Sequence, residues 1–290
     1  MNNKKVELLS PAGNLEKLKI AIKYGADAVY AGVSHFSLRI RAGKEFTFET
    51  FKEGIDYAHA HGKKVYATIN GFPFNSQIEL LKKHIATMAS LEPDGFIVAA
   101  PGVVKLCREI APQIDIHLST QANVLNYLDA QVFWDMGVTR IVVAREISLK
   151  DVIEIKKHLP DMEIEIFVHG SMCFAYSGRC LVSAVQMGRV PNRGSCANDC
   201  RFEYTLYAAN EDHGTLFRLE EEPGVGTYIF NSKDMNLASH IKEIMDSGAV
   251  DSLKIEGRTK SPYYAAVTAK AYRNAIDDYY DGKFDADRYQ

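Results

Sequence analysis

The chain has 290 residues, and a hydrophobic content of 47% is ample for a sizeable core, whether in one large barrel or in two ordinary domains. Its net charge of −3 excludes a globally basic nucleic-acid-binding protein. It leaves room for a local basic patch, and segment 170–205 carries four arginines against Asp199 and Glu203. No apolar run approaches the about 20 residues of a membrane-spanning helix, and the N-terminus lacks a signal-peptide stretch. We therefore expect a soluble, cytoplasmic protein.

Short β-branched or aromatic runs alternate with helical patterns along most of the chain, which is typical of βα units around a parallel sheet. The predicted strands are 6–9, 28–31, 64–70, 95–99, 115–119, 140–144, 163–169 and 252–256. Helices are predicted at 15–24, 48–61, 77–91, 126–136, 149–158, 237–247 and 262–280. Eight such units predict an α/β protein with a (β/α)8 TIM-like barrel. No GxGxxG follows the first strand, which argues against an open dinucleotide-binding sheet.

The alternation breaks once, after the seventh predicted strand. Residues 170–234 hold four cysteines, the polar stretch NEDHGTLFRLEEEPGVG and no clear helical period, so we predict a long functional insertion there. Barrel enzymes place their chemistry on loops at the C-terminal ends of the strands, and this insertion emerges from that end. We predict one domain over residues 1–290 that includes the insertion.

Cys173, Cys180, Cys196 and Cys200 lie within 28 residues of one another. Clustered thiolates hold zinc or iron–sulfur clusters, so bound metal is the favoured interpretation. Two disulfides would need an oxidising compartment, and reduced structural thiols or a redox pair are further alternatives. The spacing C-x6-C-x15-C-x3-C lacks the CxxC pairs of zinc ribbons and leaves the metal undecided. Cys107, on a separate predicted helix, is expected to be a small buried hydrophobe.

The strand assignments also predict which polar side chains meet at the catalytic end of the barrel. Five of them are predicted to bind substrate: Arg39, Arg41, Asn70, Gln121 and Arg145. Three are predicted to be catalytic: His169, Glu256 and Arg258. Paired guanidinium groups suit bidentate capture of carboxylate or phosphate, while surface arginines with apolar stems are the alternative for Arg39 and Arg41.

Structural interpretations compete with several of these assignments. Asn14 suits a helix N-cap, and His117 suits a satisfied position in the barrel interior. A simple ion pair is the alternative for Arg145 with Glu146, and another is the alternative for Glu256 with Arg258. If the barrel is closed, Glu256 and Arg258 must face the same mouth as the cysteine insertion.

The polar residues include no complete hydrolytic signature. There is no HExxH motif of zinc proteases and no GxSxG nucleophile elbow. Ser171 follows His169 in HGSMC, but adjacency in sequence does not supply the geometry that activates a nucleophile. A cysteine nucleophile paired with His169 is conceivable, although shared coordination explains four clustered thiols better.

Motifs along nearly the whole chain resemble the U32 peptidase family, also called collagenase-like proteases. They are ELLSPAGNLEKLKIAIKYGADAVYAG, HFSLRIR, HLSTQANVLN, MGVTRIVVARE, FVHGSMCFAYSGRC, RVPNRGSCANDCRFEY and LKIEGRTKSPYY. Within that family the chain resembles the bacterial tRNA hydroxylation proteins, which help convert wobble uridine to 5-hydroxyuridine. The resemblance implies a [4Fe–4S] cluster on Cys173, Cys180, Cys196 and Cys200, with zinc as the alternative metal. It also implies tRNA as partner and prephenate, a small carboxylate, as co-substrate.

The resemblance leaves other functions open. Related proteins hydroxylate a cytidine of ribosomal RNA or act in oxygen-independent ubiquinone synthesis, and the family label raises a peptidase. A non-catalytic scaffold in a hydroxylation complex, with a structural cluster, is a further alternative. RNA-acting relatives usually continue into a small C-terminal domain, whereas this sequence stops soon after its last predicted helix, at DADRYQ. Either the sequence is truncated or it is a short member without that domain, and a short member keeps the ubiquinone-pathway alternative open.

Overall fold

The computed structural model describes residues 5–33, 36–37, 46–194, 196–202, 204–210, 212–219 and 234–290. In these parts of the chain, eight parallel strands close into a barrel, in the order β1-β2-β3-β4-β5-β6-β7-β11. They are β1 (Glu7–Pro11), β2 (Ala28–Ala31), β3 (Lys64–Ile69), β4 (Gly95–Val98), β5 (Asp115–Leu118), β6 (Arg140–Val142), β7 (Glu163–Ser171) and β11 (Ser252–Ile255). The ring closes because β11 pairs in parallel with both β7 and β1.

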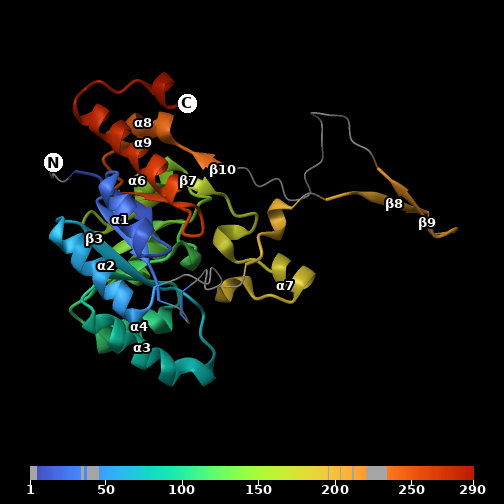
Figure 1. Ribbon diagram of the computed structural model, residues 1–290, viewed down its shortest axis with the longest axis horizontal. Helices are drawn as coiled ribbons and strands as arrows, with labels where there is room; N and C mark the ends of the chain where they lie inside the picture. The colour runs from blue at the N-terminus through green and yellow to red at the C-terminus, as the bar shows by residue number, and fades with distance from the viewer. Residues whose placement is uncertain are drawn as a thin grey trace.

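Helices cover the outside of the barrel (Figure 1). They are α1 (Leu15–Lys23), α2 (Phe48–Ala60), α3 (Ile78–Ser90), α4 (Pro101–Ile110), α5 (Tyr127–Asp135), α6 (Leu149–His158), α8 (Ile241–Asp246) and α9 (Pro262–Tyr280). Local signals fix their starts: the Asn14 side chain accepts from Lys17 N at 3.0 Å, which confirms it as an N-cap. The (β/α)8 prediction is therefore confirmed.

Two apolar layers hold the barrel together. The larger lies between strands and helices and includes Cys107, which is fully buried on α4 as expected. The smaller lies inside the barrel and consists of Leu9, Ala28, Tyr30, Tyr66 and Ile97. Because successive residues of a strand face opposite sides, β1, β2, β3 and β4 contribute to both layers.

Beside the inner apolar layer, the barrel interior is charged. Arg140, 2% exposed, contacts Glu7 at 2.6 Å, Glu163 at 2.6 Å and Glu165 at 3.2 Å. Lys254 reaches the other oxygen of Glu165 at 2.6 Å. Buried charges persist only when they are paired and hydrogen-bonded, and this network satisfies that condition across four strands. His117 is also buried within the interior, as expected.

The insertion after β7 is more structured than its sequence pattern suggested. It holds the short helix α7 (Val182–Met187), the hairpin of β8 (Tyr207–Asn210) and β9 (Thr215–Arg218), and β10 (Asp234–Asn236). β10 runs antiparallel to the end of β7, and the hairpin lies outermost, away from the barrel (Figure 1). The sequence shows no helical period there because α7, with six residues, is too short to produce one.

No helix in the described ranges is both long enough and apolar enough to cross a bilayer.

Candidate active site

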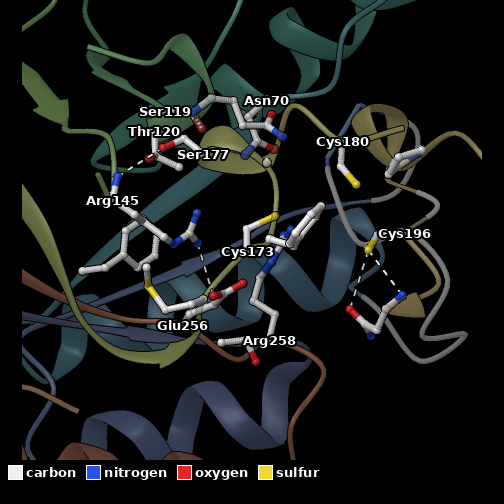
Figure 2. A pocket seen from close by; sticks show the side chains of 18 of the residues that line it. Asn70, Ser119, Thr120, Arg145, Cys173, Ser177, Cys180, Cys196, Glu256 and Arg258 are labelled. Atoms are coloured by element: carbon white, nitrogen blue, oxygen red, sulfur yellow. Dashed lines mark hydrogen bonds and ion pairs between the residues drawn. The ribbon is translucent and has the colours of Figure 1, made fainter. Parts of the chain in front are cut away.

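A pocket lies at the C-terminal end of the barrel, between the strand ends and the insertion (Figure 2). Its floor is formed by barrel side chains, among them Tyr30, Ile97 and Phe167, and its roof by the insertion. Many of the predicted site residues line it: Asn70, Gln121, Arg145, Glu256, Arg258, Cys173, Cys180, Cys196 and Cys200. Arg39 and Arg41 lie outside the described residues.

Glu256 and Arg145 form an ion pair in this pocket. The Arg145 Nη2 atom lies 3.2 Å from Glu256 Oε2, and their side chains are 8% and 18% exposed. The guanidinium also stacks over Phe167, with its carbon 4.0 Å from the ring centroid. The alternative of an Arg145–Glu146 pair was wrong, because the Glu146 carboxylate instead accepts from the backbone N–H and the hydroxyl of Ser177.

A close backbone approach places Glu256 beside the end of β7. Gly170 has a φ of +119°, and a Cβ built there would lie 2.8 Å from the Cβ of Glu256. A side chain at position 170 would therefore displace the carboxylate. The close approach therefore explains why residue 170, after His169, is a glycine.

Arg258 hydrogen-bonds to a hydroxyl on β3 and to one in the segment that follows β2. Its Nη1 atom donates to Ser37 Oγ at 2.8 Å and to Thr68 Oγ1 at 3.0 Å. These two hydroxyls also share a hydrogen bond of 2.6 Å. Figure 2 shows the side chain of Arg258 near Cys173, so a second guanidinium stands at the pocket.

Lys254 is a pocket residue that the sequence reasoning missed. It is 4% exposed, and its ammonium lies 4.5 Å from the centroid of the Tyr30 ring. Burial lowers the pKa of Lys254, while the Glu165 carboxylate opposes that shift. The signal was present, because Lys254 lies two positions before Glu256 on one strand and must face the same side.

His169 does not line the pocket. Its Nδ1 atom lies 3.4 Å from the hydroxyl of Tyr272, which donates to the carbonyl of Val168 at 2.7 Å. Burial lowers the pKa of His169, although a hydrogen bond with Asn236 opposes the shift. The His169 side chain thus does not line the pocket with Glu256 and Arg258, although the His169 carbonyl accepts from Glu256 N at 2.8 Å.

The four clustered cysteines share the pocket but are not drawn together. All four are unoxidised thiols. Within the described ranges, no three His, Cys, Asp or Glu side chains are grouped to hold a metal ion. Two sulfurs already accept backbone hydrogen bonds, Cys180 from Val182 N at 3.3 Å and Cys196 from Asn198 N at 3.4 Å. The donor chemistry suits a thiolate-bound centre, and binding one requires these loops to close around it.

Polar contacts fasten the cysteine loops to each other. The Ser183 hydroxyl on α7 donates to the Asp199 carboxylate and accepts from Ala197 N at 3.1 Å. Both side chains are at most 2% exposed. Tyr204 adds a hydrogen bond to the Asp199 carbonyl at 2.8 Å. This Ser183–Asp199 clamp ties the Cys196–Cys200 loop to the helix that starts next to Cys180.

A second set of contacts fastens the insertion to the barrel. Ser177 has a φ of +41°, in the left-handed region that is strained for serine, and is fully buried. The N–H and the hydroxyl of Ser177 both donate to the Glu146 carboxylate, and Ser177 Oγ accepts from Arg145 N at 3.1 Å. Arg179 Nε donates to the Gln121 carbonyl at 3.2 Å. The insertion is therefore attached next to Arg145, a residue of the pocket floor.

Comparison with known proteins identifies relatives over almost the whole chain. The profile of peptidase family U32 matches residues 13–290. tRNA hydroxylation protein P of Helicobacter pylori is 74% identical over 275 residues, which are 95% of this chain and 65% of that protein. tRNA hydroxylation protein P of Escherichia coli is 43% identical, over 96% of this chain and 69% of that protein. The chain thus spans about two-thirds of the length of these relatives.

A solved structure shares the fold. The U32 peptidase Mk0906 superposes with a TM-score of 0.57 at 15% sequence identity, covering 90% of this chain and 96% of that one. At this identity the likeness concerns the barrel alone.

Proposed function

The chain belongs to peptidase family U32, and from that membership we propose that it acts in tRNA hydroxylation, converting wobble uridine to 5-hydroxyuridine. The observation that carries the proposal is the 74% identity, over 95% of the chain, to a tRNA hydroxylation protein. Such a protein would work in the cytoplasm, where tRNA is found.

The pocket supports this proposal by its chemistry. Tyr30, Ile97 and Phe167 give it apolar and aromatic surface on which a planar base can pack. Asn70 and Gln121 supply amide groups that can hydrogen-bond a base edge. An enzyme that modifies a base must take it out of the stack into such a pocket.

We propose that Glu256 is the general acid or base of the site. Arg145 contacts its carboxylate at 3.2 Å and so holds it in place at the pocket. Arg258 and Arg145 present two guanidinium groups to the same pocket. They suit bidentate binding of the carboxylates of prephenate, the proposed source of the hydroxyl group.

We propose further that Cys173, Cys180, Cys196 and Cys200 hold a [4Fe–4S] cluster, with zinc as the alternative metal. Four unoxidised thiols that line one pocket support this assignment, as do the backbone N–H groups directed at two of the sulfurs. When bound, such a cluster supplies electron transfer or a Lewis-acidic iron at the mouth of the barrel. The protein residues around it bind and orient the base.

Mass spectrometry of tRNA nucleosides tests the proposal. A strain that lacks this gene should lose 5-hydroxyuridine and its derivatives, and the wild-type gene should restore them. Glu256→Gln should fail to restore them, whereas Glu109→Gln, on the exposed face of α4, should succeed. Unchanged 5-hydroxyuridine in the deletion strain would refute the function.

A further inference from the structure

Large aromatic side chains are exposed around the mouth of the pocket. Phe174, Tyr176 and Phe202, all on the insertion, are 51%, 48% and 50% exposed. Single exposed apolar residues are ordinary, but a group beside a functional pocket indicates a binding surface. We call these three residues the aromatic rim.

Contacts between two loops bring the rim together. Arg201 Nη2 donates to the Met172 carbonyl at 3.0 Å, and the backbone of Phe174 hydrogen-bonds the sulfur of Cys200. The chain segments that carry Phe174 and Phe202 are therefore neighbours, although 28 positions separate these residues in the sequence. Phe174 and Arg201 also line the pocket itself, so the rim is continuous with its entrance.

The rim lies in the most basic part of the insertion. Segment 170–205 has a net charge of +2, from four arginines and two acids, in a chain whose net charge is −3. Asp199, one of the two acids, is 1% exposed and hydrogen-bonded to Ser183, which keeps its charge away from the surface. Arg179 is exposed at the same mouth. Arg201 is ion-paired with Asp234 at 2.6 Å, so the basic character of the rim rests on arginines such as Arg179, which suit the phosphates of a nucleic acid.

We infer that the aromatic rim binds the unpaired nucleotides of an RNA loop by stacking, next to the base that enters the pocket. This inference rests on the proposed function and deepens it. Exposed aromatic faces interleaved with arginines are the usual means of holding single-stranded nucleic acid, because every base offers a face for stacking and every nucleotide a phosphate. A rigid duplex offers no such faces, so the rim selects a loop over a helix.

Binding of a fluorescent anticodon stem-loop RNA to the purified protein tests the inference. Phe202→Ala and Phe174→Ala should each weaken binding by about tenfold or more, since stacking on one base contributes that much. Phe202→Trp should retain binding. The matched control is Phe217→Ala: Phe217 lies on the outer hairpin and is 57% exposed. It should bind like the wild type, and circular dichroism and metal content verify that each variant is intact.

Several outcomes would overturn the inference. The first is wild-type protein that does not bind the stem-loop, and the second is wild-type RNA affinity in both alanine variants. The others are a loss of RNA affinity in Phe217→Ala equal to that of the rim variants, and equal affinity of the wild type for the stem-loop and for a duplex without a loop. Rim variants that release a protein partner but bind RNA normally would assign the rim to that partner instead. Hydroxylation is measured separately. Rim-dependent RNA binding without any hydroxylation would refute the proposed function alone.

Discussion

The barrel and the cysteine insertion differ in the interactions that hold them together. In the barrel, each strand is hydrogen-bonded on both sides and its apolar residues are buried. In the insertion, the described segments are short, and large apolar side chains such as Leu181 and Val185 are 69% and 83% exposed. The barrel therefore supplies stability by itself, whereas the insertion is held by a few polar contacts and is suited to closing around a ligand.

The two regions meet at the pocket, where their difference becomes functional. The floor comes from rigid strand ends, and the thiols come from loops that are anchored at Ser177 and clamped by Ser183. Changes in the barrel should mainly alter folding, and changes in the insertion should mainly alter what the pocket binds. Four variants test this division, in order of decreasing effect.

The largest effect is expected from Arg140 in the barrel interior. Arg140→Ala leaves Glu7, Glu163 and Glu165 without the guanidinium that they share, and breaking a buried network costs about 3–5 kcal/mol. Urea unfolding measures the loss. Lys105→Ala, whose exposed partner Glu109 lies 3.9 Å away, should cost about 0–1 kcal/mol. Equal losses in the two variants would contradict the assignment of stability to the interior network.

Glu256→Gln should separate function from folding at the junction of the two regions. The substitution keeps the shape of the side chain and removes its charge, so hydroxylation should fall by about 100-fold or more as expected for loss of a general acid or base. Metal content and melting temperature should change little. A clearly lower melting temperature with normal activity would make the Arg145–Glu256 pair purely structural.

Asp199→Asn should loosen the insertion and spare the barrel. Asparagine retains the shape but loses the charge-assisted hydrogen bond with Ser183, a local loss of about 1–3 kcal/mol. Limited proteolysis should cut the insertion faster, and bound metal should dissociate faster, while the barrel melts as in the wild type. A melting temperature of the barrel that falls together with metal retention would show that the two regions are not independent.

His169 should contribute the smallest effect, seen as a pH dependence of stability. Burial lowers its pKa below the ordinary value of 6.5, so the unfolded chain takes up a proton before the folded chain does. Folding stability should therefore decline as pH falls below about 7 toward the folded pKa. Melting temperatures from pH 5 to 8 should vary less in His169→Gln. Parallel profiles in the two proteins would place the titrating group elsewhere.

The sequence predicted the barrel well because the spacing of apolar residues along a helix or strand follows from which of its faces is buried. Strand β2 and helices α6 and α9 have the predicted bounds, since each has a clear apolar pattern between turn or capping residues. The same reasoning correctly placed Glu256 and Arg258 in one pocket with the cysteines. A closed barrel allows no other arrangement of these strand ends.

Pairing between side chains was not predictable in the same way. Arg145 and Glu146 are adjacent in sequence but face different partners, Glu256 and Ser177, because β6 ends before them and the chain turns. His169 lies on β7, which continues to Ser171 beyond the predicted end at His169, and its side chain turns toward Tyr272, since β10 pairs beside it. Such choices depend on tertiary neighbours that a single sequence does not reveal.

The function proposed here depends on a thiolate-bound iron–sulfur centre, which we propose the insertion holds over the barrel floor. Iron and acid-labile sulfide content of protein purified without air tests it most directly. We expect four irons and four sulfides per chain, most of which are lost in Cys196→Ala and retained in Cys107→Ala, because Cys107 is buried on α4. Stoichiometric zinc without iron or sulfide, or a full complement of iron in Cys196→Ala, would contradict the claim.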